Sequence, residues 1–135
     1  AAIDEREIHS RYFAAMNLAG VSEELLGKVL RVKGKKDRLT SVVEDLTYIQ
    51  DNLWNKLGWA KRSPKECKKF LGSTKNAIKH MDAGSDLNAR LYFEVEDESK
   101  WLIKSAIQNL DAIGIKRSEK VEAFLAMYSE DELPE

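Results

Sequence analysis

Lys75, Asn76 and His80 lie close together in the stretch STKNAIKH, which covers residues 73–80 and holds one of the two histidines of the chain. The imidazole of a histidine titrates near neutral pH, so it can donate or accept a proton at a ribose hydroxyl or a leaving oxygen. A neighbouring lysine supplies positive charge that stabilises a phosphate during such a reaction. These residue types therefore suggest phosphoryl chemistry on a nucleic acid.

A helix must position these residues, because a strong helix start signal precedes them. Ser63 and Glu66 form an S-x-x-E capping box, and Pro64 stands at the first helical position, where its missing N–H costs nothing. We expect the helix to cover residues 64–81. A helical wheel places the histidine and the asparagine one turn apart on the polar face. The opposite face is predicted to enter the core and carries Cys67, Phe70, Leu71, Thr74, Ala77, Ile78 and Met81.

The polar face of this helix, together with the loop before it, is dense in positive charge and carries one acidic residue, Glu66. Solvent-facing helices more often intersperse glutamates with lysines, so the single sign favours a surface that attracts phosphate or an acidic partner. Simple solvation of an amphipathic helix is the alternative interpretation. Gly72, which the wheel also places on this face, would permit a close approach or a bend. The predicted phosphate-binding or partner-binding residues are Lys61, Arg62, Lys65, Lys68, Lys69 and Lys79.

The six residues KNAIKH resemble the signature of the HEPN superfamily, helical bundles in which an arginine followed by a polar residue precedes a histidine by several positions. Many members are metal-independent endoribonucleases that work as dimers, and others are inactive binding or scaffolding modules. The resemblance implies that Lys75 takes the place of the phosphate-contacting arginine and that Asn76 is its polar neighbour. It also implies that His80 is the general acid or base in cleavage through the RNA 2′-hydroxyl.

Length and composition predict one globular domain over residues 1–135. The chain is 43% hydrophobic and 33% charged and has two prolines, which is typical of a globular, helix-rich protein. Its formal net charge of −1 argues against nucleic-acid binding over the whole surface and leaves room for a local basic patch. Cys67 is the only cysteine, and with two distant histidines it gives no zinc-ligand spacing. We therefore expect no metal, no cofactor and a reducing compartment.

The ends and the apolar runs of the chain bear on its location. No apolar run approaches the length of a membrane span, and the first residues, AAIDEREIH, lack the basic region and the hydrophobic stretch of a signal peptide. We expect a soluble, cytoplasmic protein that does not enter a membrane. The sequence begins without methionine, which leaves open a processed or trimmed upstream segment.

Helical periodicity runs through nearly the whole chain and predicts an all-α bundle of about five or six helices. Gly20 is the expected stop between the first two helices, and Ser118 is the expected N-cap of the last. Alternating apolar and polar residues predict one extended loop near residues 82–96, because a single strand cannot make a sheet. The expected helices cover residues 4–20, 22–32, 39–58, 64–81, 97–113 and a segment that begins at 118.

We interpret the chain as a binding or interaction module, not an enzyme, whose basic helix face contacts an acidic partner or a nucleic acid. A second copy of the chain, through its acidic residues 94–98, is one candidate partner, so we expect a homo-oligomer or an acidic protein partner. RNA is the other candidate. The alternative interpretation is a HEPN-like endoribonuclease, or an RNA-binding relative, that uses Lys75, Asn76 and His80.

Overall fold

The computed structural model of the protein describes residues 1–73 and 94–129, and the elements in these two ranges are all helical. This confirms the predicted all-α bundle. The helices are α1 (Ala2–Glu7), α2 (Tyr12–Val32), α3 (Arg38–Ile49), the π-helix η1 (Gln50–Trp54), α4 (Asn55–Leu57), α5 (Pro64–Leu71), α7 (Val95–Ile113) and α8 (Glu119–Met127).

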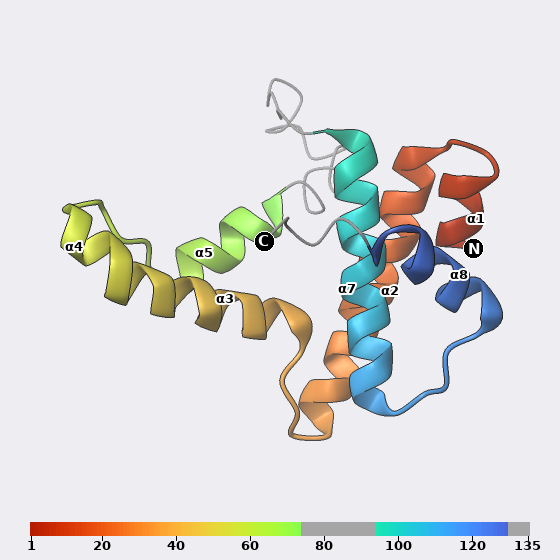
Figure 1. Cartoon of the computed structure of the whole chain (residues 1–135). Coiled ribbons are helices and arrows are strands. Elements are labelled where there is room, and N and C mark those ends of the chain that lie inside the picture. Colours follow the sequence, from red (N-terminus) through yellow and green to blue (C-terminus); the bar gives the residue numbers. More distant parts are fainter. Residues whose placement is uncertain (74–93, 130–135) are drawn as a thin grey trace, which may run out of the picture.

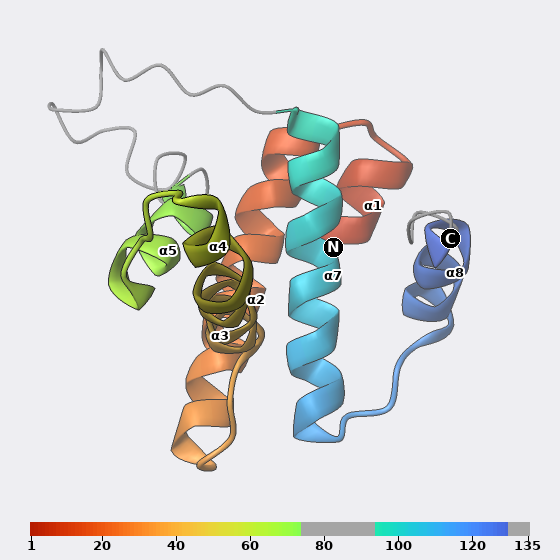
Figure 2. The ribbon, with the colours of Figure 1, turned by 60° about the vertical axis from the view of Figure 1, so that its left-hand side comes forward.

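Four helices, α1, α2, α7 and α8, form what we call the body of the molecule (Figure 1). The long helices α2 and α7 lie side by side in both ribbon views (Figure 2), and α1 and α8 pack beside them. Apolar side chains from three of these helices meet in a single cluster, whose burial supplies most of the favourable free energy of folding. The cluster consists of Met16, Ala19, Leu102, Ile103, Ile107 and Phe124.

α2 is one continuous helix, so the predicted break at Gly20 is wrong. Gly20 is buried in the interior of α2, and the glycine that follows the helix with a positive φ is Gly34. Packing against α7 stabilises the helix by more than the roughly 1 kcal/mol that an interior glycine costs. The chain breaks earlier instead, between α1 and α2, where Ser10 adopts a φ of 50°.

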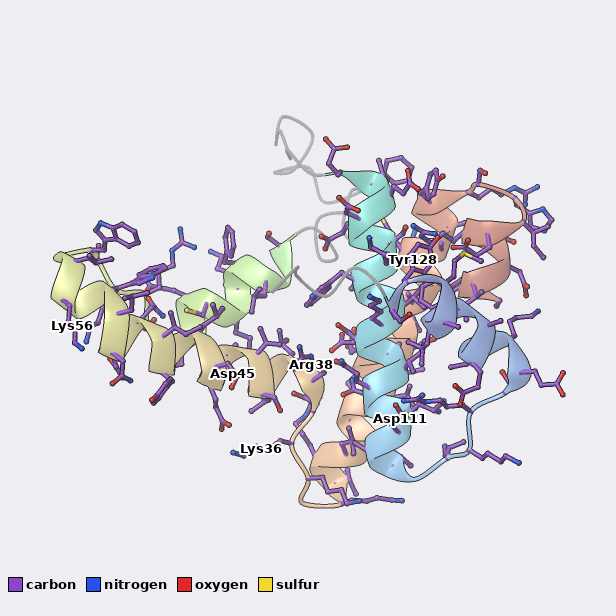
Figure 3. All side chains as sticks on the ribbon, viewed as in Figure 1. Lys36, Arg38, Asp45, Lys56, Asp111 and Tyr128 are labelled. Atoms are coloured by element: carbon purple, nitrogen blue, oxygen red, sulfur yellow. The ribbon has the colours of Figure 1, made fainter. Side chains whose placement is uncertain are left out.

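A buried arginine fastens α1 to the rest of the body. The Nε of Arg6 donates a hydrogen bond to Ser99 Oγ of α7 at 3.1 Å. Its Nη1 donates both to the neighbouring Glu7 carboxylate and to the hydroxyl of Tyr128, the residue that follows α8. Figure 3 shows Tyr128 beside α7. One guanidinium therefore links the first helix to two helices that are far away in the sequence.

The remaining described helices, α3, η1, α4 and α5, form what we call the arm, which projects from the body (Figure 1). The predicted helix over residues 39–58 is confirmed in extent, because α3, η1 and α4 follow one another without a gap and Gly58 ends them with a φ of 69°. Its apolar side chains are less buried than the sequence suggests. Ile49, Leu53 and Leu57 are exposed, whereas Val43 is buried.

The junction between the body and the arm is polar and buried. Asn109 of α7 donates from Nδ2 to the Glu23 carbonyl of α2 at 3.1 Å, and its Oδ1 accepts from the Arg38 backbone N–H at 2.7 Å. Arg38 marks the start of the arm in Figure 3. Asp37, the N-cap of α3, accepts from Thr40 N at 2.8 Å and forms an ion pair with Arg31. The arm is thus attached by hydrogen bonds rather than by a shared apolar core.

Charge at this junction is stabilised by its surroundings. Burial alone would raise the pKa of the Asp37 carboxyl group. The hydrogen bonds from Thr40 and the positive charges of Arg31 and Lys68 outweigh burial, so the pKa of Asp37 lies below its ordinary value. Because Lys68 belongs to α5, this long-range effect shows that α5 lies near the start of α3.

The last two helices begin close to the predicted positions. α7 starts at Val95, so the predicted loop near 82–96 is wrong for residues 95 and 96. Three carboxylates in the first turn of α7 favour this earlier start through the helix dipole. The rest of that loop, and residues 74–81 of the helix predicted over 64–81, lie outside the described residues. Ser118 caps α8 as predicted and accepts from the Val121 N–H at 3.4 Å.

Candidate nucleic-acid interface

The predicted catalytic cluster lies outside the described residues. Lys75, Asn76 and His80 all fall in the range 74–93, and so does Lys79 of the predicted binding residues. Their arrangement therefore stays a prediction. The other five predicted binding residues belong to the arm, in α5 and in the loop that leads into it.

The start of α5 is built as the sequence predicts. Ser63 Oγ accepts from the Glu66 backbone N–H at 3.3 Å, and the Glu66 carboxylate accepts in return from the Ser63 backbone N–H at 2.7 Å. The donation from this backbone N–H lowers the pKa of Glu66 below its ordinary value. The one acidic residue of α5 is therefore engaged at the helix end, where the helix dipole also favours negative charge.

The two basic residues of the loop before α5 contact the arm itself. Lys61 Nζ lies 2.8 Å from Asp51 Oδ1, which ties the loop to η1. The guanidinium carbon of Arg62 lies 4.6 Å from the centre of the Phe70 ring, within the range of a cation–π interaction. Arg62 is therefore held against an aromatic ring, and its side chain remains exposed.

Three lysines of α5 are exposed, and within residues 1–73 and 94–129 none of them forms an ion pair. On a helical wheel, Lys65 and Lys69 lie opposite the buried Cys67, and Lys68 lies on the flank that faces Asp37. α5 thus presents positive charge that the described part of the protein does not neutralise by direct contact.

The buried side chain of Gln50 fixes the position of α5 on the arm, and the sequence analysis missed it. Gln50 Oε1 accepts from the Arg62 backbone N–H at 2.6 Å, and Nε2 lies 3.4 Å from Cys67 Sγ. The sequence does contain a sign that Gln50 is buried. Gln50 falls at helical spacing between Leu46 and Leu53, so it is a polar residue on the apolar face of the predicted helix. Gln50 also begins the π-helix, a local widening that often accompanies functional sites.

Two aromatic rings are exposed next to the basic residues, and one of them corrects a prediction. Phe70, predicted to lie in the core, is 59% exposed. Gly72, predicted on the polar face, is buried, whereas Cys67 is buried as predicted. The reason is that α5 packs mainly on α3, with Gln50 of η1 beside Cys67, so only a narrow face of it is covered by the described helices. Trp59 is 58% exposed and packs edge-on against Trp54, with 6.0 Å between ring centres.

The acidic residues predicted to attract a second copy lie at the start of α7. Glu96 Oε1 lies 3.8 Å from Arg6 Nη2, and Asp97 lies 3.5 Å from Lys100. Burial raises the pKa of Glu98 above its ordinary value. These contacts give the carboxylates a role in the body, at the N-terminus of a helix, where negative charge is favourable.

No protein-family model, characterised protein or solved structure matches the chain at a significant level, so the resemblance carried by residues 75–80 stays a prediction. In the described part of the chain, no cluster of three or more histidine, cysteine or acidic side chains is placed to hold a metal ion. None of the helices described is both long and apolar enough to cross a membrane.

Proposed function

We propose that the protein binds single-stranded RNA through a surface on the arm, which we call the basic-aromatic surface. Positive charge tracks the phosphates of a single strand, and exposed aromatic rings stack on its bases. The observation that carries the proposal is the exposed Phe70 ring, which holds the Arg62 guanidinium next to a helix whose lysines form no ion pair with the described residues. The surface consists of Trp59, Arg62, Lys65, Lys68, Lys69 and Phe70.

The aromatic rings favour a nucleic acid over an acidic protein. Lysines alone would serve either partner, because both offer negative charge. Stacking of a base on an aromatic side chain contributes about 1–3 kcal/mol, and an exposed ring offers this only to a partner with flat rings. The HEPN resemblance of residues 75–80 supports RNA rather than DNA, since its implied chemistry uses the 2′-hydroxyl.

A fluorescence titration with a short, unstructured, labelled RNA tests the proposal. For a single strand, the logarithm of the affinity falls with the logarithm of salt concentration by about 0.7 for each phosphate contact. The double variant Lys65→Ala/Lys69→Ala should therefore bind more weakly and show a salt slope smaller by about 1.4. The matched control, Lys33→Ala/Lys116→Ala, removes the same charge from exposed positions outside the arm and should bind like the wild type.

Phe70→Leu separates RNA from an acidic protein partner. Loss of the ring should weaken RNA binding at every salt concentration and leave the salt slope unchanged, because no phosphate contact is lost. A polyglutamate peptide in place of RNA should respond to the lysine variants and not to Phe70→Leu. Absence of RNA binding at low salt, or equal weakening by the control pair, would contradict the proposal.

Cleavage of the bound RNA is the catalytic version of this proposal. It assigns phosphate contact to Lys75, a polar supporting role to Asn76 and proton transfer to His80. His80→Ala should abolish cleavage of a labelled RNA, resolved on a denaturing gel, and should leave binding intact. If the wild type binds the RNA and leaves it uncut, the binding proposal stands and the catalytic version fails.

A further inference from the structure

α2 carries a second apolar face in addition to the one that packs on α7. The second face is a stripe of exposed aliphatic side chains, between 41% and 89% exposed, over four helical turns. On a helical wheel they fall within an arc of about 80°, on the side opposite the residues buried against α7. We call it the α2 stripe, and it consists of Leu18, Val21, Leu25, Val29 and Val32.

The spacing of the α2 stripe is symmetric about its central residue, Leu25. Val21 and Val29 lie four residues to either side of it, and Leu18 and Val32 lie seven residues to either side. Two copies of α2 that run antiparallel, with a two-fold axis at Leu25, therefore bring every apolar side chain of the stripe opposite an apolar side chain of the other copy. A two-fold axis requires this kind of self-complementary surface.

The charges beside the α2 stripe fit the same arrangement. Glu24 and Lys28 lie on one flank of α2 and form an ion pair, with 3.1 Å between Oε1 and Nζ. In an antiparallel pair with its axis at Leu25, the same flank of each helix meets, and Glu24 of one copy lies about 3 Å along the helix axis from Lys28 of the other, within reach of these long side chains. Two opposite-charge contacts then flank the axis, whereas a parallel pair would set like charges beside each other, so the charges favour the antiparallel orientation.

The position of α2 in the molecule leaves the stripe accessible. α2 and α7 lie side by side in Figure 2. The stripe residues are exposed, and on the helical wheel they fall on the side of α2 opposite its buried residues. The stripe extends about 21 Å along the helix axis, at 1.5 Å for each residue. We propose that two copies of this chain associate through the α2 stripe as an antiparallel, two-fold symmetric dimer. A contact of this size is small for a protein interface, so the dimer is reversible and depends on concentration.

Cysteine cross-linking tests the predicted register directly. Leu25→Cys places two thiols next to the axis, within the short Cα separation that a disulfide requires, so mild oxidation should give a covalent dimer. Val32→Cys alone should not cross-link, because the two copies of residue 32 lie about 21 Å apart along the helix axis. A mixture of Val32→Cys and Leu18→Cys should cross-link as a heterodimer. The wild type, whose only cysteine is buried, is the control.

Sedimentation equilibrium measures the association without any cross-link. Leu25→Glu should raise the dissociation constant at least tenfold, because two carboxylates would meet at the apolar centre. Phe13→Glu is the matched control, since it removes an exposed apolar residue of the same helix outside the stripe, and it should not change the association. Circular dichroism confirms that both variants remain folded.

Three results would overturn the proposed dimer. The first is a wild type that remains monomeric at every concentration up to its solubility limit. The second is association that Leu25→Glu does not weaken, or Leu25→Cys that cross-links no faster than the wild type. The third is flotation of a monomeric wild type with anionic lipid vesicles that Leu25→Glu abolishes, which would assign the stripe to a membrane surface. All of these measurements are made without RNA, so their outcome is independent of the proposed RNA binding.

Discussion

The body and the arm are held together by different kinds of contact. The body buries Phe124, which is 1% exposed, in an apolar cluster drawn from helices that are distant in the sequence. The arm leaves Phe70 59% exposed and depends on polar contacts over short sequence distances, such as those of Gln50 and the Ser63 capping box. Stability therefore resides mainly in the body, and the arm can present charge and aromatic rings to a partner without weakening the core.

Phe124→Ala should cause the largest loss of stability among the substitutions that test this difference between the body and the arm. Removal of a fully buried phenylalanine typically costs about 3–5 kcal/mol of unfolding free energy, from lost burial and from the cavity that remains. Phe124 also packs on Tyr128, with 5.0 Å between ring centres, so the attachment of α8 should weaken as well. Urea denaturation followed by circular dichroism measures the loss. A cost of less than 1 kcal/mol would show that the body does not dominate stability.

Asn109→Ala should separate the arm from the body. The substitution leaves the Arg38 N–H without its acceptor, which costs about 1–3 kcal/mol for an unsatisfied buried group, and it removes the added hydrogen bond to the Glu23 carbonyl. Hydrogen exchange should then speed up at the start of α3 more than in α7. Asn109→Asp, which keeps an acceptor for Arg38 and loses the donor to Glu23, should have an intermediate effect. Uniform acceleration in both helices would indicate that the junction is not a separate unit.

Asp37→Asn should remove the part of the unfolding free energy that depends on the charge of this residue and that is lost at acid pH. The pKa of Asp37 is lowered in the folded protein, so its charge stabilises the fold above the ordinary pKa of an aspartate, and this contribution is lost as pH falls through the folded-state pKa. Asparagine still caps a helix, so the comparison isolates the charge. We expect the variant to be less stable at pH 7, because the ion pair with Arg31 and the hydrogen bond from Thr40 both lose the negative charge.

Urea denaturation of both proteins between neutral pH and about pH 3 measures this difference, which should shrink below the ordinary aspartate pKa of about 3.9. A difference in unfolding free energy that stays constant down to the lowest pH would show that the charge of Asp37 does not contribute to stability.

Phe70→Ala should have the smallest effect on stability and a clear effect on function. Because Phe70 is largely exposed, its removal should change the unfolding free energy by less than about 1 kcal/mol. The same substitution removes the ring on which Arg62 rests, so RNA affinity should fall. Paired urea and RNA titrations of this variant and of Phe124→Ala would show whether stability and binding divide between the two regions. A large loss of stability in Phe70→Ala would contradict the conclusion that stability resides mainly in the body.

Local signals in the sequence predicted the ends of helices well where a side chain acts on its own backbone. The capping box at Ser63, the N-cap at Ser118 and the stop at Gly58 are all confirmed. The stop at Gly20 was wrong because burial against α7, a contact between distant residues, outweighs the local cost of glycine. Such a contact has no signature in the residues next to Gly20.

Burial in the arm was harder to predict than helix boundaries. An amphipathic pattern marks the face that can be covered, but it does not tell how many neighbours will cover it. Phe70 is exposed because α5 packs mainly on α3 among the described helices. Gln50 is buried because its side-chain oxygen accepts a hydrogen bond from the Arg62 backbone N–H where the chain turns back. The predicted cluster at Lys75, Asn76 and His80 lies outside the described residues and remains a prediction.

The buried Arg6 has a consequence for the order in which the parts of the protein fold during synthesis. α1 has six residues, too few for a helix to persist alone in water, and its guanidinium contacts Tyr128, which lies 122 residues later. While the ribosome is still extending the chain, α1 can pack on α2, but Arg6 lacks its partners in α7 and next to α8. The contacts that fasten α1 to the body can therefore form only after residue 128 has left the ribosome.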